Sequence, residues 1–146
     1  MIFLGADHAG FELKEAIKKH LLERGEDCRD LGTFSTESVD YAVIAEKVCN
    51  EVVKTNSDKG LLFCGTGVGI SIAANKVNGI RAACCSDSFS VKQTRSHNNA
   101  NILCLGGRVV GTGLAADLVD AFLDTSFCGE ERHLRRINQI KQLESK

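Results

Sequence analysis

The sequence predicts an α/β fold, a single-domain, Rossmann-like three-layer α/β/α sandwich with a five-stranded parallel sheet and a C-terminal helix. Short runs that are apolar on both alternating faces are typical of strands buried on both sides. Amphipathic stretches with helical spacing separate these runs, as in a sheet built by right-handed crossovers. The chain has 146 residues, of which 43% are hydrophobic and 25% charged. That length favours one domain, residues 1–146.

The N-terminal part of the chain begins with a predicted strand at residues 2–6, where both faces are apolar. Leu13, Ile17 and Leu21 follow at helical spacing and predict the first helix. A weak second strand is expected at residues 27–30, before the next helical pattern begins.

The middle of the chain repeats the alternation of helix and strand. Tyr41, Ile44 and Val48 share one helical face and predict the second helix. An apolar strand is expected at residues 61–64, and a short alanine-rich helix at residues 70–77.

The last part of the chain supplies two more strands and three more helices. The strands are expected at residues 80–85 and 102–105. The helices are expected at residues 88–95, 114–122 and 130–143.

Composition excludes several classes of protein. Eighteen Lys and Arg against 19 Asp and Glu give a net charge of −1, which is not the basic footprint of a nucleic-acid binder. No apolar run approaches the roughly 18–20 residues of a membrane span. Asp7 and His8 come too early for a secretory signal, so we expect a cytoplasmic protein.

The seven cysteines are scattered and form no CxxC pair. This pattern argues against disulfides and against a structural zinc site. We expect most of the cysteines to be buried.

Chemically active side chains gather where the predicted strands end. Ligands of doubly wound sheets bind at the carboxyl ends of the strands. Asp7 and His8 follow the first strand, Cys64 ends the third, and His97 with Asn98 stands shortly before the last. Two of the four histidines and one cysteine therefore lie where a site is expected.

A glycine loop follows Cys64 and opens the next helix. Gly65, Gly67 and Gly69 would let the backbone approach an anion closely, and the helix start adds free N–H groups. The alternative is a tight turn with no ligand. A P-loop would need Gly-Lys-Ser/Thr, and a dinucleotide fingerprint would need a small residue where Ile70 stands, so nucleotide binding is a weak alternative.

Cys64 is the sharpest single feature. A thiol that faces a helix N-terminus has its thiolate form stabilised and can act as base or nucleophile. The alternative is a buried strand cysteine, which is what we expect of Cys84, Cys85 and Cys104.

The other candidate residues also allow two interpretations. Asp7 and His8 are an acid/base pair or an anion contact, or else a helix cap beside a surface histidine. The polar stretch that carries His97 and Asn98 is a site segment or a solvated loop.

The C-terminal helix carries a basic face. Arg132 and Arg136 are four residues apart and lie opposite Leu134, so we expect Leu134, Ile137 and Ile140 to dock on the domain. The arginines then form a solvated face, or two guanidinium forks for a phosphate, including one bound by a neighbouring subunit.

Seven segments together match one known family. They are residues 7–10, 37–41, 64–76, 79–82, 96–101, 107–111 and 132–136. On these segments the chain resembles ribose-5-phosphate isomerase B and its galactose-6-phosphate isomerase relatives. The resemblance implies interconversion of ribose 5-phosphate and ribulose 5-phosphate, a step of the non-oxidative pentose phosphate pathway, through an enediolate. It also implies no metal or organic cofactor, and a homodimer, in some members a tetramer, with active sites shared between subunits.

The resemblance also implies roles for individual residues. Cys64 would be the base at C2 and Thr66 would move a proton between O1 and O2, while Asp7 and His97 would open the furanose ring. The enediolate would be held by the amides of Gly65, Gly67, Val68 and Gly69. Substrate contacts are implied for His8, Tyr41, Asn98, Arg108, Arg132 and Arg136. Some members carry a glutamate where Ile70 stands, so this chain resembles the cysteine type.

Two other functions remain open on the sequence. A six-carbon sugar phosphate, of galactose or allose, would use the same chemistry. A non-catalytic sensor of sugar phosphates or nucleotides would bind its ligand without exchanging substrate protons with solvent.

Overall fold

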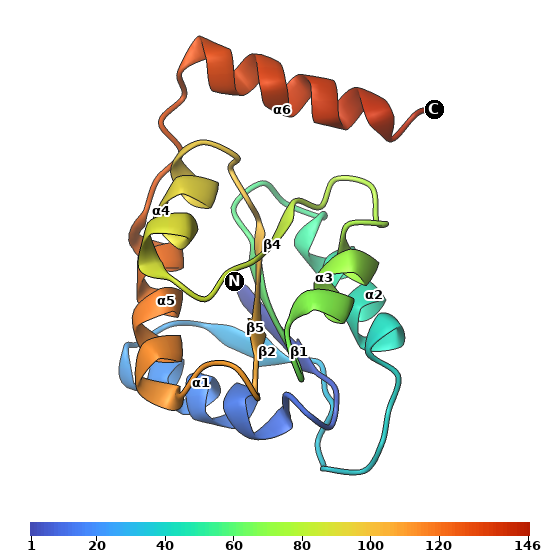
Figure 1. Cartoon of the computed structure of the whole chain (residues 1–146), viewed down its shortest axis with the longest axis vertical. Helices are drawn as coiled ribbons and strands as arrows, with labels where there is room; N and C mark the ends of the chain where they lie inside the picture. Colours follow the sequence, from blue (N-terminus) through green and yellow to red (C-terminus); the bar gives the residue numbers. More distant parts are fainter.

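A computed structural model describes all 146 residues, and strands alternate with helices along the chain (Figure 1). The predicted order of the elements is confirmed. The elements are β1 (Ile2–Ala6), α1 (Phe11–Glu23), β2 (Cys28–Asp30), α2 (Tyr41–Val52), β3 (Lys59–Cys64), α3 (Val68–Ala74), β4 (Ala82–Cys84), α4 (Ser88–Ser96), β5 (Ile102–Gly106), α5 (Thr112–Asp124) and α6 (Glu131–Leu143).

The five strands form one parallel sheet in the order β2-β1-β3-β5-β4, which confirms the predicted fold class. In the register of β3 and β5, Gly60 lies opposite Ile102 and Cys64 lies opposite Gly106. All strands therefore end at one edge of the sheet, here called the carboxyl edge, and begin at the other, the amino edge.

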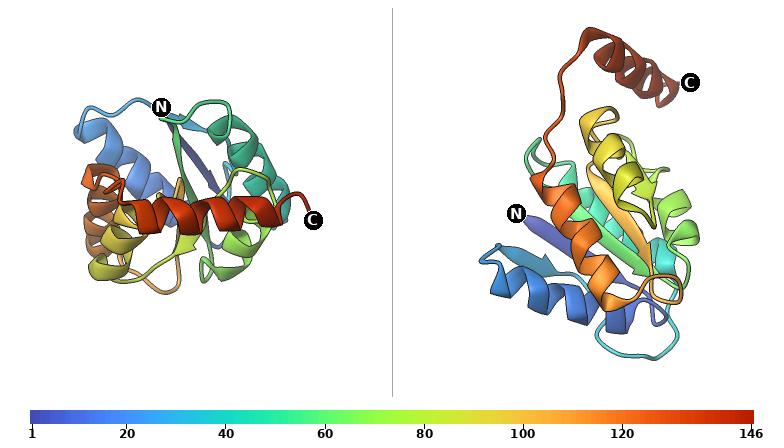
Figure 2. Two further views of the ribbon diagram at one scale, coloured as in Figure 1. Left: turned by 90° about the horizontal axis from the view of Figure 1, so that it is seen from above. Right: turned by 60° about the vertical axis from the view of Figure 1, so that its left-hand side comes forward.

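Helices cover both faces of the sheet (Figures 1 and 2). One apolar cluster joins the sheet to α1, α4 and α5 through residues such as Leu13, Val91 and Phe122. A second cluster joins the other face to α2 and α3, and Cys64 belongs to it. The thiol of Cys64 consequently lies on the side of the sheet that α3 covers.

Several element boundaries differ from the sequence prediction, and the differences at α3 and β4 have a structural cause. Helix α3 begins at Val68, two residues early, and ends at Ala74. Strand β4 is limited to Ala82–Cys84. Side chains explain the shorter elements, because the Asn75 amide exchanges hydrogen bonds of 2.9 and 2.8 Å with the backbone of Ala82. An amide side chain thus replaces regular backbone pairing between α3 and β4.

The cysteines are all free thiols, but fewer are buried than the sequence predicted. Cys49, Cys64 and Cys104 are buried. Cys84 is exposed and Cys85 is half-buried, so the expectation for this pair was wrong. The reason is topological: β4 is an edge strand of the sheet and ends beside solvent.

Helix α6 stands apart from the other layers and passes over the amino edge of the sheet (Figures 1 and 2). Its buried side chain is His133, whereas Leu134 is 44% exposed and Ile140 45% exposed. The predicted docking of Leu134 was wrong, because His133 and Ile137 share the inward face and Leu134 is turned about 100° away from it. None of the helices has the length and apolar character needed to span a bilayer.

Candidate active site

Three loops meet at the carboxyl edge of the sheet: those that follow β1, β3 and β5. The amide of Gly107 donates to the carbonyl of Cys64 at 2.8 Å, and the amide of Arg108 donates to that of Gly65 at 3.0 Å. Gly106 packs so closely that a Cβ atom there would lie 2.6 Å from the Thr66 backbone. Glycine is required at this position for the loops after β3 and β5 to touch.

Cys64 is the last residue of β3 and points into the start of α3. The Gly67 amide donates a hydrogen bond to Sγ of Cys64 across 3.1 Å. Gly67 itself has φ of +81°, a left-handed conformation that glycine adopts without strain. The side chain of Cys64 is nearly enclosed, since the residue is only 4% exposed. The predicted juxtaposition of this thiol and the glycine loop is confirmed.

The rest of the glycine loop faces outward. Thr66 and Val68 are exposed, and the Val68 amide donates to Oγ1 of Thr66 at 3.2 Å. Arg108 folds back over the loop, because its guanidinium lies 3.3 Å from where a Cβ on Gly65 would stand. A hydroxyl and a cation are therefore placed beside the loop that holds the thiol.

Cys84 is a second thiol at this loop, and no pattern in the sequence indicates that it is a neighbour of the site. Its Sγ lies 3.6 Å from the carbonyl oxygen of Thr66, within hydrogen-bond distance. Burial, together with the nearby Cys64 thiol, raises the pKa of Cys84. Cys84 is therefore a neutral donor that braces the loop.

Asp7 and His8 occupy the loop after β1. Asp7 is buried, and its Oδ1 accepts the amides of Ala9 and Gly10 at 2.9 and 3.0 Å. The carboxylate thus braces the turn that leads into α1. Nδ1 of His8 accepts the Val39 amide at 3.3 Å, which fixes the ring and ties the segment before α2 to the site.

Tyr41 begins α2 and covers the start of α3. A Cβ atom on Gly69 would lie 2.8 Å from the Tyr41 ring, so the missing side chain makes room for the phenol. The ring remains partly open to solvent, being 42% exposed. The Tyr41 ring thus packs beside the glycine loop that follows Cys64.

Four of the predicted site residues lie at the opposite edge of the sheet. His97 caps the C-terminus of α4 and Asn98 follows it, ahead of β5. The expectation that His97 and Asn98 lie at the carboxyl ends of the strands was wrong, because a segment that precedes a parallel strand lies at its amino end. The length of β5 separates the two groups by on the order of 15 Å. Arg132 and Arg136, on α6, lie at this amino edge as well.

His133 is a residue of the amino edge to which the sequence gave no role. Its ring stacks on that of His97, with centroids 4.0 Å apart and planes 9° apart. Arg132 donates from Nε to Nε2 of His133 at 3.2 Å. Burial, followed by the charges of His97 and Arg132, lowers the pKa of His133. No sequence signal connects these histidines, which are far apart in the chain.

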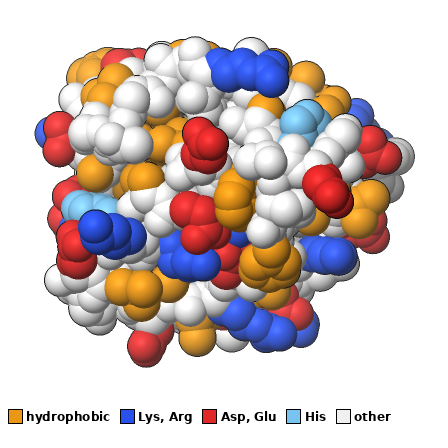
Figure 3. Space-filling view, turned by 90° about the horizontal axis from the view of Figure 1, so that it is seen from below, with side chains coloured by type: hydrophobic (Ala, Val, Ile, Leu, Met, Phe, Trp, Pro, Cys, Tyr) orange, Lys and Arg blue, Asp and Glu red, His pale blue; other side chains and the backbone are white.

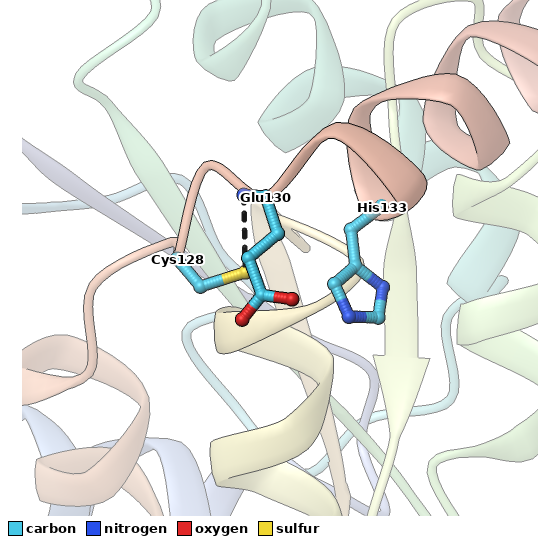
Figure 4. Close-up of side chains that lie close together, drawn as sticks. All are labelled: Cys128, Glu130 and His133. Carbon is cyan, nitrogen blue, oxygen red and sulfur yellow. Dashed lines mark hydrogen bonds between the residues drawn. The ribbon is translucent and has the colours of Figure 1, made fainter.

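Cys128, Glu130 and His133 form a cluster with the donor atoms of a transition-metal site (Figure 4). One potential ligand atom from each lies within 4.8 Å of the others. Arg132 already occupies the cluster: its guanidinium bonds His133 at 3.2 Å and pairs with Glu130 at 3.2 Å. Because this cation already contacts two of the three potential ligands, binding of a metal ion is disfavoured. We therefore interpret the cluster as the set of partners of Arg132.

The surface at the carboxyl edge carries no continuous field of one charge. Figure 3 views the molecule from this side, and acidic, basic and hydrophobic side chains alternate over it. Four cavities lie beside α6, at the amino edge, and Cys64 lines none of these four. At the carboxyl edge, Cys64 is nearly buried beside the exposed Thr66 and Val68.

Comparison with known proteins identifies the family. The sequence profile described as Ribose/Galactose Isomerase matches residues 2–140. Ribose-5-phosphate isomerase B of Escherichia coli K12 is 48% identical over 145 residues, covering 99% of this chain and 97% of that protein. The solved structure of ribose-5-phosphate isomerase B from Clostridium thermocellum superposes with a TM-score of 0.94 at 49% identity, covering 99% of this chain and 97% of that one. The ribose 5-phosphate isomerase structure from Thermotoga maritima gives 0.93 at 51% identity, covering 97% of each chain. The chain belongs to the ribose/galactose isomerase family and is an isomerase.

Proposed function

We propose that the protein interconverts ribose 5-phosphate and ribulose 5-phosphate, with Cys64 as the base that removes the proton from C2. The observation that carries the proposal is the position of the Cys64 sulfur, 3.1 Å from the Gly67 amide at the start of α3. The identity of the substrate is inferred from two relatives, which are 48% and 49% identical to this chain and are named ribose-5-phosphate isomerase B.

The chemistry needs a base and an oxyanion site side by side. Removing the proton beside the carbonyl builds negative charge on oxygen, which gives an enediolate. Preorganised donors at such an oxygen are worth about 3–4 kcal/mol each in other enzymes. The amides of Gly67 and Val68 donate to Cys64 and Thr66, whereas the amide of Gly69 has no partner within the helix and is available for this purpose. Thr66, exposed beside them, would carry the proton between O1 and O2.

Ring opening and phosphate binding need more groups than one carboxyl edge provides. Asp7, His8 and Arg108 lie near Cys64, but His97 and the arginines of α6 lie at the other edge. We infer that a second copy of the chain brings its amino edge against this carboxyl edge. His97 and Asn98 would then face the sugar, and Arg132 and Arg136 its phosphate.

Exposed apolar side chains beside both half-sites support an assembly of two copies. Val68 and Ile72, on α3 next to Cys64, are 51% and 59% exposed. Leu143 on α6 is 61% exposed. Contact between such surfaces would bury apolar area and close the site over the thiol. Exclusion of water there would also strengthen the electrostatic contacts to the enediolate.

Proton exchange tests the role of Cys64. In deuterated water, we expect NMR to detect deuterium entering ribose 5-phosphate with the wild-type protein and not with Cys64→Ala. Cys28→Ala, which removes a half-buried thiol from β2, is the matched control and is expected to exchange normally. Exchange by Cys64→Ala at the wild-type rate would refute the assignment, as would absence of exchange with the wild type.

A six-carbon substrate is the second candidate, because the family is described by both ribose and galactose. Galactose 6-phosphate has one more CHOH unit between the reacting carbons and the phosphate, and the opposite configuration at C3. Comparison of kcat/KM for ribose 5-phosphate and galactose 6-phosphate separates them. We expect the five-carbon sugar to be preferred.

A further inference from the structure

A second cluster of cations lines a cavity at the amino edge, away from Cys64. The cavity has a volume of about 450 Å³ and lies between α6 and the start of β3. Such a volume is in the range of small-molecule sites. Ile137, Ile140 and Lys141 of α6 line it, as does Glu144 just after the helix; Arg132 and Arg136, assigned above to substrate phosphate, are not among the lining residues.

Positive charge in this cavity exceeds negative charge. Lys59, Arg81, Arg95 and Lys141 line it, and none of them forms an ion pair with a carboxylate. The two acidic residues of the lining make their hydrogen bonds to other groups, although their charges favour the protonated forms of Lys59 and Arg81. Asp58 pairs with the N-terminal amine at 3.1 Å, and Glu144 accepts the Gly79 amide at 2.7 Å.

Several donors of these cations have no protein partner. Arg81 uses Nε and Nη2 on backbone carbonyls and leaves Nη1 free. Arg95 uses Nε and Nη1 and leaves Nη2 free. Nζ of Lys59 makes no hydrogen bond. Burial and the positive charge of Arg95 lower the pKa of Lys59, as burial and the charge of Arg81 do for Arg95.

We propose that this cavity binds a phosphorylated small molecule, at a site separate from that of the substrate. A phosphoryl group offers several charged acceptor oxygens and suits guanidinium and ammonium donors that converge. Its negative charge would relieve the repulsion among Lys59, Arg81 and Arg95. A single carboxylate would neutralise less of this charge.

The same arginines hold the turn that carries His97 and Asn98. Arg81 donates from Nε to the carbonyl of Asn98 at 3.0 Å and from Nη2 to that of Asn99 at 2.9 Å. Arg95 donates to Oδ1 of Asn99 at 3.0 Å. Asn99 itself has φ of +48°, which these contacts maintain. An anion in the cavity would therefore alter how His97 and Asn98 are presented to the partner subunit's substrate. This consequence rests on the function proposed above.

Calorimetry with inorganic pyrophosphate tests the site. Arg136→Ala serves as the background, because it removes a cation proposed for the substrate phosphate. We expect pyrophosphate to bind this variant, and Lys59→Gln with Lys141→Gln to weaken the affinity about tenfold or more. Lys47→Gln in α2 with Lys54→Gln just after α2, both at exposed positions outside the cavity lining, removes the same charge and is expected to leave the affinity unchanged.

Three outcomes would overturn the proposal. One is no binding in the Arg136→Ala background. Another is equal affinity with and without the cavity lysines, and the third is equal weakening by the control pair. Lys141→Gln alone, on the exposed side of α6, keeps the test valid if Lys59→Gln impairs folding, and is expected to weaken binding.

NMR of the His97 ring tests the coupling to the turn. In the Arg136→Ala background, we expect pyrophosphate to shift the His97 signals, and the cavity variant to lose this response. Unshifted signals at saturation would refute the coupling. Failure of the proposed isomerase activity would leave the pyrophosphate isotherm unchanged, so the two proposals fail separately.

Discussion

The imidazole rings of His97 and His133 are stacked, 4.0 Å apart between centroids and 9° from parallel. This contact holds the start of α6 against the end of α4. At the other end of α6, Glu144 accepts the amide of Gly79 at 2.7 Å. The helix is therefore attached at two points and spans the amino edge between them, which places Arg132 and Arg136 beside His97.

Protonation of His133 is expected to loosen this attachment. Burial and neighbouring positive groups lower its pKa from the ordinary value of 6.5. The unfolded state then binds a proton more readily than the folded state. The contribution of His133 to stability is present above pH 6.5 and is lost as the pH falls through the lower folded-state pKa.

An NMR titration of the His133 ring measures this effect directly, with His133→Gln used to assign the signals. We expect a midpoint below 6.5 and faster amide exchange in α6 as the ring protonates. A midpoint at or above 6.5 would contradict the account.

Lys14→Met is expected to destabilise the protein by about 3 kcal/mol. Lys14 is fully buried, and its Nζ donates to both carboxylate oxygens of Asp30, at 2.7 and 2.6 Å, and to the carbonyl of Thr33. Burial opposes ionisation of Asp30, but the bonds from Lys14, Gly32 and Lys18 keep its pKa below normal. Removal of Lys14 leaves a largely buried carboxylate with Lys18 as its remaining basic partner.

Urea denaturation at neutral pH checks the effect of Lys14→Met. Lys18→Met is the control, because Lys18 binds the same carboxylate from a side chain that is 31% exposed. We expect the control to lose less than about 1 kcal/mol. Equal losses in the two variants would show that burial of Lys14 is not the cause.

Gly106→Ala is expected to reduce turnover at least about tenfold through displacement of the glycine loop. The new methyl group would lie 2.6–2.8 Å from the backbone of Thr66, which must move. Gly113→Ala is the matched control, since a Cβ there meets nothing within 4 Å. Steady-state kinetics on ribose 5-phosphate compares the two. Normal turnover in Gly106→Ala would mean that loop position does not limit the reaction.

The rate of thiol alkylation is expected to be lower for buried cysteines than for exposed ones. Burial raises the pKa of Cys49 to about 12 and that of Cys104 well above normal. Both thiols then stay protonated and unreactive near pH 8, whereas Cys128 is exposed. Mass spectrometry after iodoacetamide treatment should find Cys128 modified first, with Cys49 and Cys104 modified only in urea. Early labelling of Cys104 in the folded protein would refute the burial argument.

Much of the fold and one half of the candidate site follow from local sequence patterns. Apolar runs identify the strands, and the rule that sites lie at strand ends brings together Asp7, Cys64 and the glycine loop. Each strand can be recognised within a single segment of the sequence, and one rule of topology then places the site residues together.

The second half of the site depends on contacts that no local pattern encodes. His97 lies at the amino edge because residues before a strand lie there, and periodicity does not indicate that it would contribute, as proposed, to the site of a second copy. His133 replaces Leu134 on the inward face of α6 because stacking on His97 sets the rotation of the helix. Exposure of Cys84 follows from the position of β4 at the edge of the sheet.

Complementation between two inactive variants tests the shared site most directly. Cys64→Ala and His97→Gln, each expected to be inactive alone, are unfolded together in urea and refolded as a mixture. If one copy supplies Cys64 and the other His97, half of the dimers are mixed and each contains one intact site, so activity on ribose 5-phosphate should return to about a quarter of wild type. A refolded mixture that stays as inactive as its components would contradict the account.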